Sequence, residues 1–124
     1  MNLYPTLKKL YPEGSYGGQC FAFMHKLVKQ DSSFPALGMF LESKYRELLR
    51  SGIPLAKLDS IKVGDVLLLS YSPFGHGSIV NNIVGDKLQL TESNYKYDLK
   101  VHHTRTIPFH DKAIMGVWRG TPLY

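Results

Sequence analysis

The hydrophobic pattern changes its period near residue 60, and this change constrains the fold strongly. Before it, apolar residues recur at helical spacing over 19–29 and 37–50. After it, the apolar runs are short, and five of them are predicted to be strands: residues 63–71, the two halves of 76–95 joined at "GD", 98–109 and 113–120. Residues 4–18 are rich in Pro, Gly and Tyr, which predicts loop or short turns. The order predicts an α+β domain with N-terminal helices packed on a curved antiparallel sheet of about five strands.

The size and composition of the chain fit a single domain. Its 124 residues suit one core, and its single cysteine cannot form an internal disulfide, so the fold must rest on packing. We expect a monomer. The net charge of +5 suits an anionic partner, but the basic residues are spread out and no nucleic-acid-binding motif occurs. No stretch reaches the roughly 18 to 20 apolar residues of a membrane span, and no apolar leader opens the chain, which predicts cytoplasmic synthesis.

The only cysteine, Cys20, lies in "YGGQCFAF", where a glycine-rich loop ends and the first helical pattern begins. Unpaired backbone N–H groups and the helix dipole at such a position favour the thiolate, which is the nucleophilic form of cysteine. The same N–H groups could stabilise an oxyanion, and the glycines would let a substrate backbone approach closely. A small buried side chain is the alternative role, since most free cysteines have it. The local sequence leaves both roles open.

A nucleophilic cysteine needs a base, and the base needs a partner that orients it. His76 lies between two glycines in "PFGHGSIV", at the start of a predicted strand, and is the candidate base. On the next predicted strand Glu92 and Asn94 are two residues apart, so they share one face and either could lie behind His76. The alternatives are a histidine on a surface loop and a solvated strand end.

The successive motifs "GSYGGQC", "GDVLLLSY", "GHGSIV", "ESNY" and "IMGVWRG" resemble those of the CHAP family, the cysteine, histidine-dependent amidohydrolases and peptidases. The resemblance covers residues 11–120, and its most specific parts are Gln-Cys, Gly-His and Glu-x-Asn. It implies a papain-like fold, similar also to NlpC/P60 domains, with residues 1–124 forming a single catalytic domain.

The resemblance also implies a role for each motif residue. Cys20 would be the nucleophile and His76 the general base, with Glu92 orienting His76 and Asn94 supporting the site. The side chain of Gln19 and the backbone N–H of Cys20 are candidates for the oxyanion hole. The implied reaction is acyl transfer through a thioester, which water then hydrolyses.

The implied substrate is bacterial peptidoglycan, cut either within its peptides (endopeptidase) or between muramic acid and L-alanine (amidase). The basic charge would help attraction to anionic wall polymers. Without a leader, the enzyme would reach the wall as a phage endolysin released through a holin, as a virion component or as an injected effector. A cysteine amidohydrolase acting on another amide, and a non-catalytic phage structural or binding module, are the alternative functions.

We expect no cofactor and no metal. Some phage CHAP enzymes bind Ca²⁺ through clustered aspartates before the cysteine, but this loop offers only Glu13, and Ala22 stands where those enzymes can carry an acid. Zinc is not expected either, because the adjacent His102 and His103 would point to opposite faces of a strand with no acid or cysteine spaced to join them. We interpret both as surface or partly packed, and His25 as structural.

Aromatic residues next to the motifs are candidates for lining a substrate groove, since peptide clefts combine aromatic walls with few polar anchors. These residues are Tyr16, Tyr71, Phe74, Tyr95 and Tyr97. We predict that Tyr16, Phe74 and Tyr95 contact the substrate. The lone Trp118, in the last predicted strand, is expected to pack in the core.

Overall fold

The computed structural model describes residues 1–29, 60–71 and 75–124. The predicted helix over 37–50 and the candidate Phe74 lie outside these residues. The described elements are two helices, α1 (Tyr4–Leu10) and α2 (Cys20–Leu27), and six strands, β1 (Val66–Leu69), β2 (His76–Val84), β3 (Lys87–Ser93), β4 (Val101–His102), β5 (Thr106–Pro108) and β6 (Ile114–Trp118). The helices pack on an antiparallel six-stranded sheet, as the α+β prediction requires.

Residues 4–10 form helix α1, so the prediction of a loop over 4–18 is wrong for its first half. Pro5 lies in the first turn of the helix, where the missing N–H of a proline costs no helical hydrogen bond. Leu7 is fully buried and anchors the helix to the core, while Lys8 and Lys9 in the last turn suit the negative end of the helix dipole. A proline that suggested a loop therefore begins a helix.

The sheet has the order β4-β3-β2-β1-β6, and β5 pairs with β3 beside β4. The predicted hairpin at "GD" is confirmed: β2 and β3 are antiparallel neighbours, and Gly85 takes the positive φ of 61° that the tight turn requires. The prediction of one strand over 98–109 is wrong, because this segment forms two short strands. Both pair with β3, β4 opposite Glu92 and Ser93 and β5 opposite residues 87–89.

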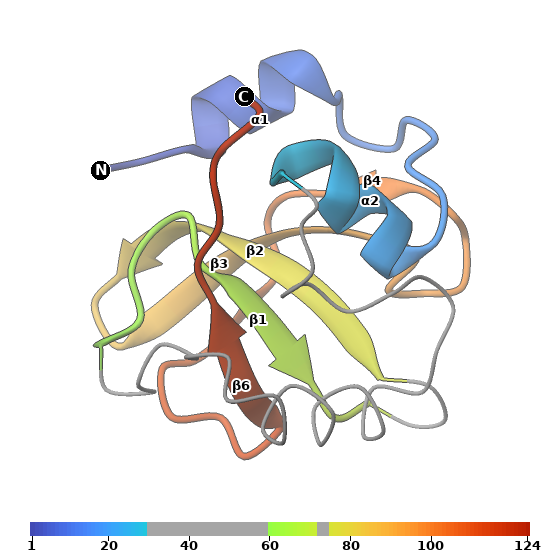
Figure 1. Ribbon diagram of the computed structural model, residues 1–124. Helices are drawn as coiled ribbons and strands as arrows, with labels where there is room; N and C mark the ends of the chain where they lie inside the picture. Colours follow the sequence, from blue (N-terminus) through green and yellow to red (C-terminus); the bar gives the residue numbers. More distant parts are fainter. Residues whose placement is uncertain (30–59, 72–74) are drawn as a thin grey trace.

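Apolar side chains pack on both faces of the sheet, and Figure 1 shows both helices on the same side of it. Two clusters of buried side chains result. The cluster on the helix side contains Leu3, Leu7, Phe23, Met24, Leu27, Val28, Val66, Ile79, Val101 and Trp118. The cluster on the other face contains Ile61, Leu67, Leu69, Val80, Leu88, Leu90, Ile107, Ile114 and Val117. Trp118 thus packs in the core, as expected.

Helix α2 lies close to the start of β2 because residue 77 is a glycine. A Cβ atom at Gly77 would lie 2.8 Å from Cε1 of Phe21 and 3.3 Å from Cγ of Met24, both on α2. Any larger residue would have to displace the helix or the Phe21 ring. This close packing brings the first residue of α2 beside the first residue of β2.

Candidate active site

Cys20 is the first residue of α2, as the sequence predicted, and Gln19 precedes it in an extended conformation. The loop before the helix is held by Ser93 at the end of β3, whose Oγ donates to the carbonyl oxygen of Gly18 at 2.7 Å. Gly17 is buried against Ser93 and Val101, so of the two glycines expected to admit a substrate backbone, this one has its space occupied by protein side chains. The glycine loop serves to bring α2 close to β3.

His76 begins β2 and is only 4% exposed, which excludes the alternative of a surface loop histidine. Its Nε2 lies 2.9 Å from Oε1 of Glu92. The other ring nitrogen, Nδ1, is therefore the one left for the hydrogen bond between His76 and Cys20. The imidazole lies in series between the thiol and a carboxylate, which is the geometry that a general base requires.

The surroundings of Cys20 favour its thiolate. Burial alone would raise the pKa of the thiol, but its hydrogen bond with His76 and the charge of His76 lower it, so the pKa of Cys20 lies below its usual value. Backbone N–H groups of Gly77 and Phe21 also donate to the sulfur and add to this effect. Burial likewise lowers the pKa of His76, but Cys20 and Glu92 outweigh it and raise that pKa. Both shifts favour a thiolate–imidazolium pair.

Glu92 is fully buried and accepts hydrogen bonds on both oxygens. Ser78 Oγ donates to Oε1 at 2.8 Å, beside the bond from His76. Arg105 donates from Nη2 to Oε1 and from Nε to Oε2, both at 2.7 Å. Burial raises the pKa of this carboxyl, but Arg105 and then His76 dominate and lower it to about 2. Glu92 therefore stays ionised behind His76. Arg105 was not among the residues predicted from the sequence, and only its place on the segment after the two adjacent histidines could have drawn attention to it.

Asn94 does not share a strand face with Glu92, because β3 ends at Ser93 and Asn94 has a φ of 66°. Its Oδ1 accepts from the backbone N–H of Leu99 at 2.9 Å, and its Nδ2 donates to Oε1 of Gln19 at 3.1 Å. The bond leaves the NH₂ end of the Gln19 amide available as a donor. Asn94 thus supports the site through Gln19, and Glu92 is the residue that contacts His76.

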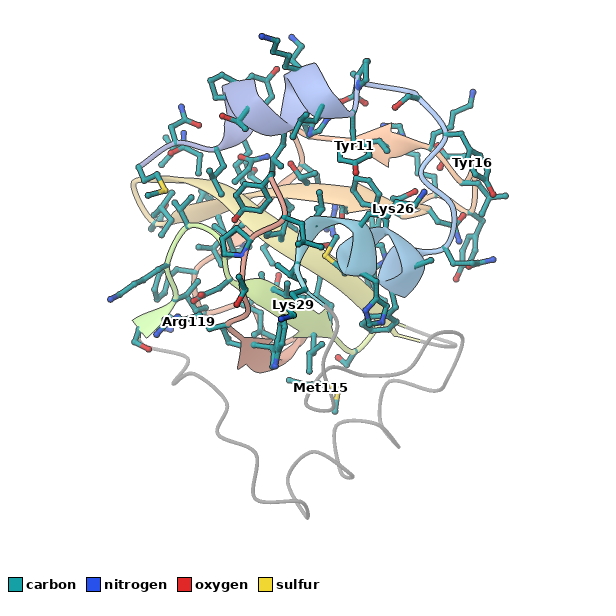
Figure 2. All side chains as sticks on the ribbon, turned by 45° about the horizontal axis from the view of Figure 1, so that its top comes forward. Tyr11, Tyr16, Lys26, Lys29, Met115 and Arg119 are labelled. Atoms are coloured by element: carbon teal, nitrogen blue, oxygen red, sulfur yellow. The ribbon has the colours of Figure 1, made fainter. Side chains whose placement is uncertain are left out.

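A pocket of about 350 Å³ opens over Cys20 and His76. It is lined by Gln19, Cys20, Tyr71, Gly75, His76, Asn94, Tyr95, Tyr97 and Leu99. Tyr71 stacks on the His76 ring with centroids 5.8 Å apart, and Tyr95 lies at the same distance with its ring tilted. The candidate Tyr95 thus lies in the pocket. The candidate Tyr16 does not line it; it is 72% exposed at the outer edge of the loop that joins α1 to α2 (Figure 2).

Two histidines that we interpreted as surface or partly packed differ from each other. His103 is fully buried, with Nε2 on the carbonyl oxygen of Tyr11 and Nδ1 on Thr91 Oγ1, so this interpretation is wrong for His103. His102 is partly exposed, but acids do join it: Glu13 Oε2 lies 2.6 Å from Nδ1 and Asp98 Oδ2 lies 2.8 Å from Nε2. Spacing along the chain could not reveal Glu13, which lies 89 residues away.

Neither a metal site nor a membrane span is found in the described part of the chain. Its histidines, cysteine and acids form no group of three or more that could hold a metal ion. None of the described helices is long and apolar enough to cross a bilayer.

The comparisons with known proteins bear on the fold alone. No family model matches the chain, and no curated protein matches it. Among solved structures, the crystal structure of Ly7917 is similar, with a TM-score of 0.64 over 97% of this chain and 14% sequence identity. The chain spans 61% of the length of Ly7917. This likeness supports the α+β architecture described above.

Proposed function

We propose that the protein is a cysteine amidohydrolase of the CHAP type, with a papain-like fold, that cleaves amide bonds of bacterial peptidoglycan. One observation carries the proposal: the thiol at the start of α2, the imidazole at the start of β2 and a buried carboxylate on β3 are hydrogen-bonded in series beside a pocket. The resemblance of the motifs around these residues to those of the CHAP family supplies the substrate class.

The reaction would proceed by acyl transfer. The Cys20 thiolate attacks the amide carbonyl carbon, and the carbonyl oxygen becomes an oxyanion facing the backbone N–H of Cys20 and the side-chain NH₂ of Gln19. The C–N bond then breaks as the His76 imidazolium gives its proton to the leaving amine, which leaves a thioester on Cys20. Neutral His76 next takes a proton from water, which attacks the thioester and releases the acid. Glu92 stabilises the imidazolium in each step in which His76 is protonated.

The proposed setting is a phage endolysin or a virion-associated lysin. The net charge of +5 suits attraction to anionic wall polymers. The pocket combines aromatic walls with the polar side chains of Gln19 and Asn94, which suits a peptide portion of the wall. Both a peptide bond in the stem or cross-bridge and the bond between muramic acid and L-alanine are candidates for cleavage.

The test is a digest of purified peptidoglycan from several bacteria, read by mass spectrometry, with wild type beside Cys20→Ala. We expect new fragments from wild type alone, with masses that identify the bond, while thermal unfolding shows that both proteins are folded. Fragments from Cys20→Ala at the wild-type rate would contradict the mechanism. No digestion of any wall, together with rapid alkylation of Cys20, would favour another amide substrate, and no digestion with a slowly reacting thiol would favour a non-catalytic module.

A further inference from the structure

Arg105, on the segment between β4 and β5, makes a bidentate hydrogen bond to the carboxylate of Glu92. Nε and Nη2 each donate to a different oxygen at 2.7 Å. The carboxylate is fully buried, and the Arg105 side chain is 19% exposed. Two parallel bonds from a planar guanidinium fix both the position and the rotation of a carboxylate, which a single ammonium cannot do.

The same guanidinium holds two aromatic rings against His76. Its Nη1 donates to the Tyr71 hydroxyl at 2.8 Å, and its central carbon lies 3.8 Å from the centre of the Tyr95 ring. Tyr71 and Tyr95 both contact the His76 ring and line the pocket. Arg105 therefore acts on His76 through two sets of contacts: through Glu92, which is hydrogen-bonded to the imidazole, and through the two tyrosine rings that pack against it.

The charge of Glu92 decides which nitrogen of neutral His76 carries the proton. An ionised Glu92 only accepts hydrogen bonds, so Nε2 keeps the proton and Nδ1 is free to accept one from Cys20. A protonated Glu92 would donate to Nε2 instead and leave the proton on Nδ1, facing the thiol. A base with that tautomer cannot take the proton of Cys20.

Few other groups could supply the charge that Glu92 needs. From β2, His76 and Ser78 face the carboxylate, and only His76 can be charged. His102 is directly opposite Glu92 on β4, but its ring bonds to Glu13 and Asp98. Tyr71 follows β1, and its hydroxyl, which accepts a hydrogen bond from Arg105, supplies no positive charge. Among the described residues, Arg105 is the permanent cation hydrogen-bonded to Glu92.

We propose that Arg105 is the positioning residue of this site: it holds Glu92 ionised and correctly rotated, holds Tyr71 and Tyr95 against His76, and thereby maintains the His76 tautomer that accepts the Cys20 proton. The proposal rests on the proposed roles of Cys20 and His76. Removal of Arg105 should therefore weaken the support that Glu92 and His76 give to the Cys20 thiolate.

The experiment measures the rate of Cys20 alkylation by iodoacetamide from pH 5 to pH 10, which needs no substrate and has a single thiol to report on. For Arg105→Gln we expect the midpoint of the profile to move toward higher pH and the rate near pH 6 to fall on the order of tenfold. Arg105→Lys keeps the positive charge but cannot make the bidentate hydrogen bond, so its alkylation midpoint and rate should fall between those of Arg105→Gln and wild type.

Arg119 offers a matched control, because it makes the same kind of bidentate hydrogen bond with Asp65. Its Nε donates to Oδ1 at 2.7 Å and its Nη2 donates to Oδ2 at 2.9 Å. Figure 2 shows Arg119 on the opposite side of the molecule from the loop before α2. Arg119→Gln should lower the thermal midpoint without moving the alkylation profile. A shift of equal size in both variants would show a general loss of stability and overturn the proposal.

If Arg105→Gln is folded and its alkylation profile matches that of wild type, the positioning role of Arg105 is also overturned. If Arg105→Gln does not fold, Arg105→Lys decides, and a wild-type rate at every pH would then refute the positioning role. The outcome is separate from that of the wall digest. If wild type does not digest peptidoglycan but its alkylation depends strongly on Arg105, the proposed substrate is wrong and the positioning role of Arg105 stands. If Arg105→Gln digests peptidoglycan at the wild-type rate, the proposed substrate stands and the positioning role of Arg105 is wrong.

Discussion

At the scale of single residues, the site is a line of three groups in which each one changes the proton affinity of the next. Glu92, with a pKa of about 2, is ionised at any pH at which the protein would work. It raises the pKa of His76, which with Cys20 forms a coupled pair. The thiolate and the imidazolium coexist at pH values above the lowered pKa of Cys20 and below the raised pKa of His76.

For the proposed amidohydrolase, this coupling predicts a bell-shaped dependence of kcat/KM on pH. The acid limb follows loss of the thiolate below the pKa of Cys20, and the alkaline limb follows loss of the imidazolium above the pKa of His76. Cys20 and Glu92 together raise the pKa of His76, and Glu92→Gln removes the charge of the second. The alkaline limb should therefore move to lower pH, and the maximum should fall on the order of tenfold or more.

Ser78→Ala is the matched control for Glu92→Gln. It removes one neutral hydrogen bond to the same carboxylate oxygen and leaves the charge and the bonds from His76 and Arg105 in place. We expect a nearly unchanged alkaline limb, measured with the wall fragment that the digest identifies. An alkaline limb that moves equally in both variants would show that the charge of Glu92 does not set the pKa of His76.

At the scale of elements, the site depends on the contact between α2 and β2 at Gly77. Gly77→Ala would place a Cβ atom 2.8 Å from the Phe21 ring, so the helix must shift or the ring must turn. We expect a loss of about 1–3 kcal/mol in the free energy of unfolding, which is typical of overpacking. Because the shift separates Cys20 from His76, alkylation of the thiol near pH 6 should slow as well.

Gly85→Ala separates the two effects of Gly77→Ala. Gly85 has open space around it but a positive φ, so alanine there should cost about 1–2 kcal/mol through the backbone alone. Its turn joins β2 to β3 at the ends away from His76, so the alkylation rate should stay at its wild-type value. If alkylation slows equally in Gly77→Ala and Gly85→Ala, the reactivity of Cys20 depends on overall stability and not on the position of α2.

The sequence allowed prediction of those elements whose local pattern agrees with their environment. The hairpin of β2 and β3 combines apolar strands with a turn that favours glycine, and the start of α2 follows a glycine-rich loop. Helix α1 and the division between β4 and β5 were missed, because buried contacts of Leu7 and pairing with β3 decide them. Asn94 was placed on the wrong face because a strand period was extended one residue beyond the end of the strand. Arg105 could not be found from spacing, since its partner is 13 residues away across the sheet.

At the scale of the whole molecule, a charged cluster joins two segments that flank the pocket. His102 lies between Glu13, on the loop before α2, and Asp98, on the segment after β3. Backbone bonds from Gly14 and Gly17 to Val101 and Leu99 join the same two segments. The cluster thus helps to hold the loop that leads to Cys20 against the sheet.

The cluster predicts a pH-dependent contribution to stability. Burial lowers the pKa of His102, but Asp98 and Glu13 outweigh it and raise the pKa above its usual value of 6.5. A group with a raised pKa contributes stability that is complete below the unfolded value and is lost as pH rises through the folded value. The difference in thermal midpoint between wild type and His102→Gln should therefore be large at pH 5.5 and shrink as the pH rises above the raised pKa.

His110→Gln provides the comparison, because His110 is exposed and lies on the segment after β5. Its difference from wild type should be small. If the difference for His102→Gln also stays constant with pH, the cluster contributes no charge-dependent stability.

The pairing of β3 has a consequence for the motions of the site. This strand, which carries Glu92, is joined to β2 along one edge and to β4 and β5 along the other, whereas Cys20 lies on a helix of eight residues that follows a loop. Opening of an element costs little where few apolar side chains are buried, but Phe23, Met24 and Leu27 of this helix are fully buried, and β3 is bonded along both edges. Because His76 belongs to β2, the imidazole and its carboxylate lie on paired strands, and the thiol lies on the helix that packs against them. Separation of the thiol from the imidazole therefore requires exposure of core side chains, so the three groups stay together as long as the core stays packed.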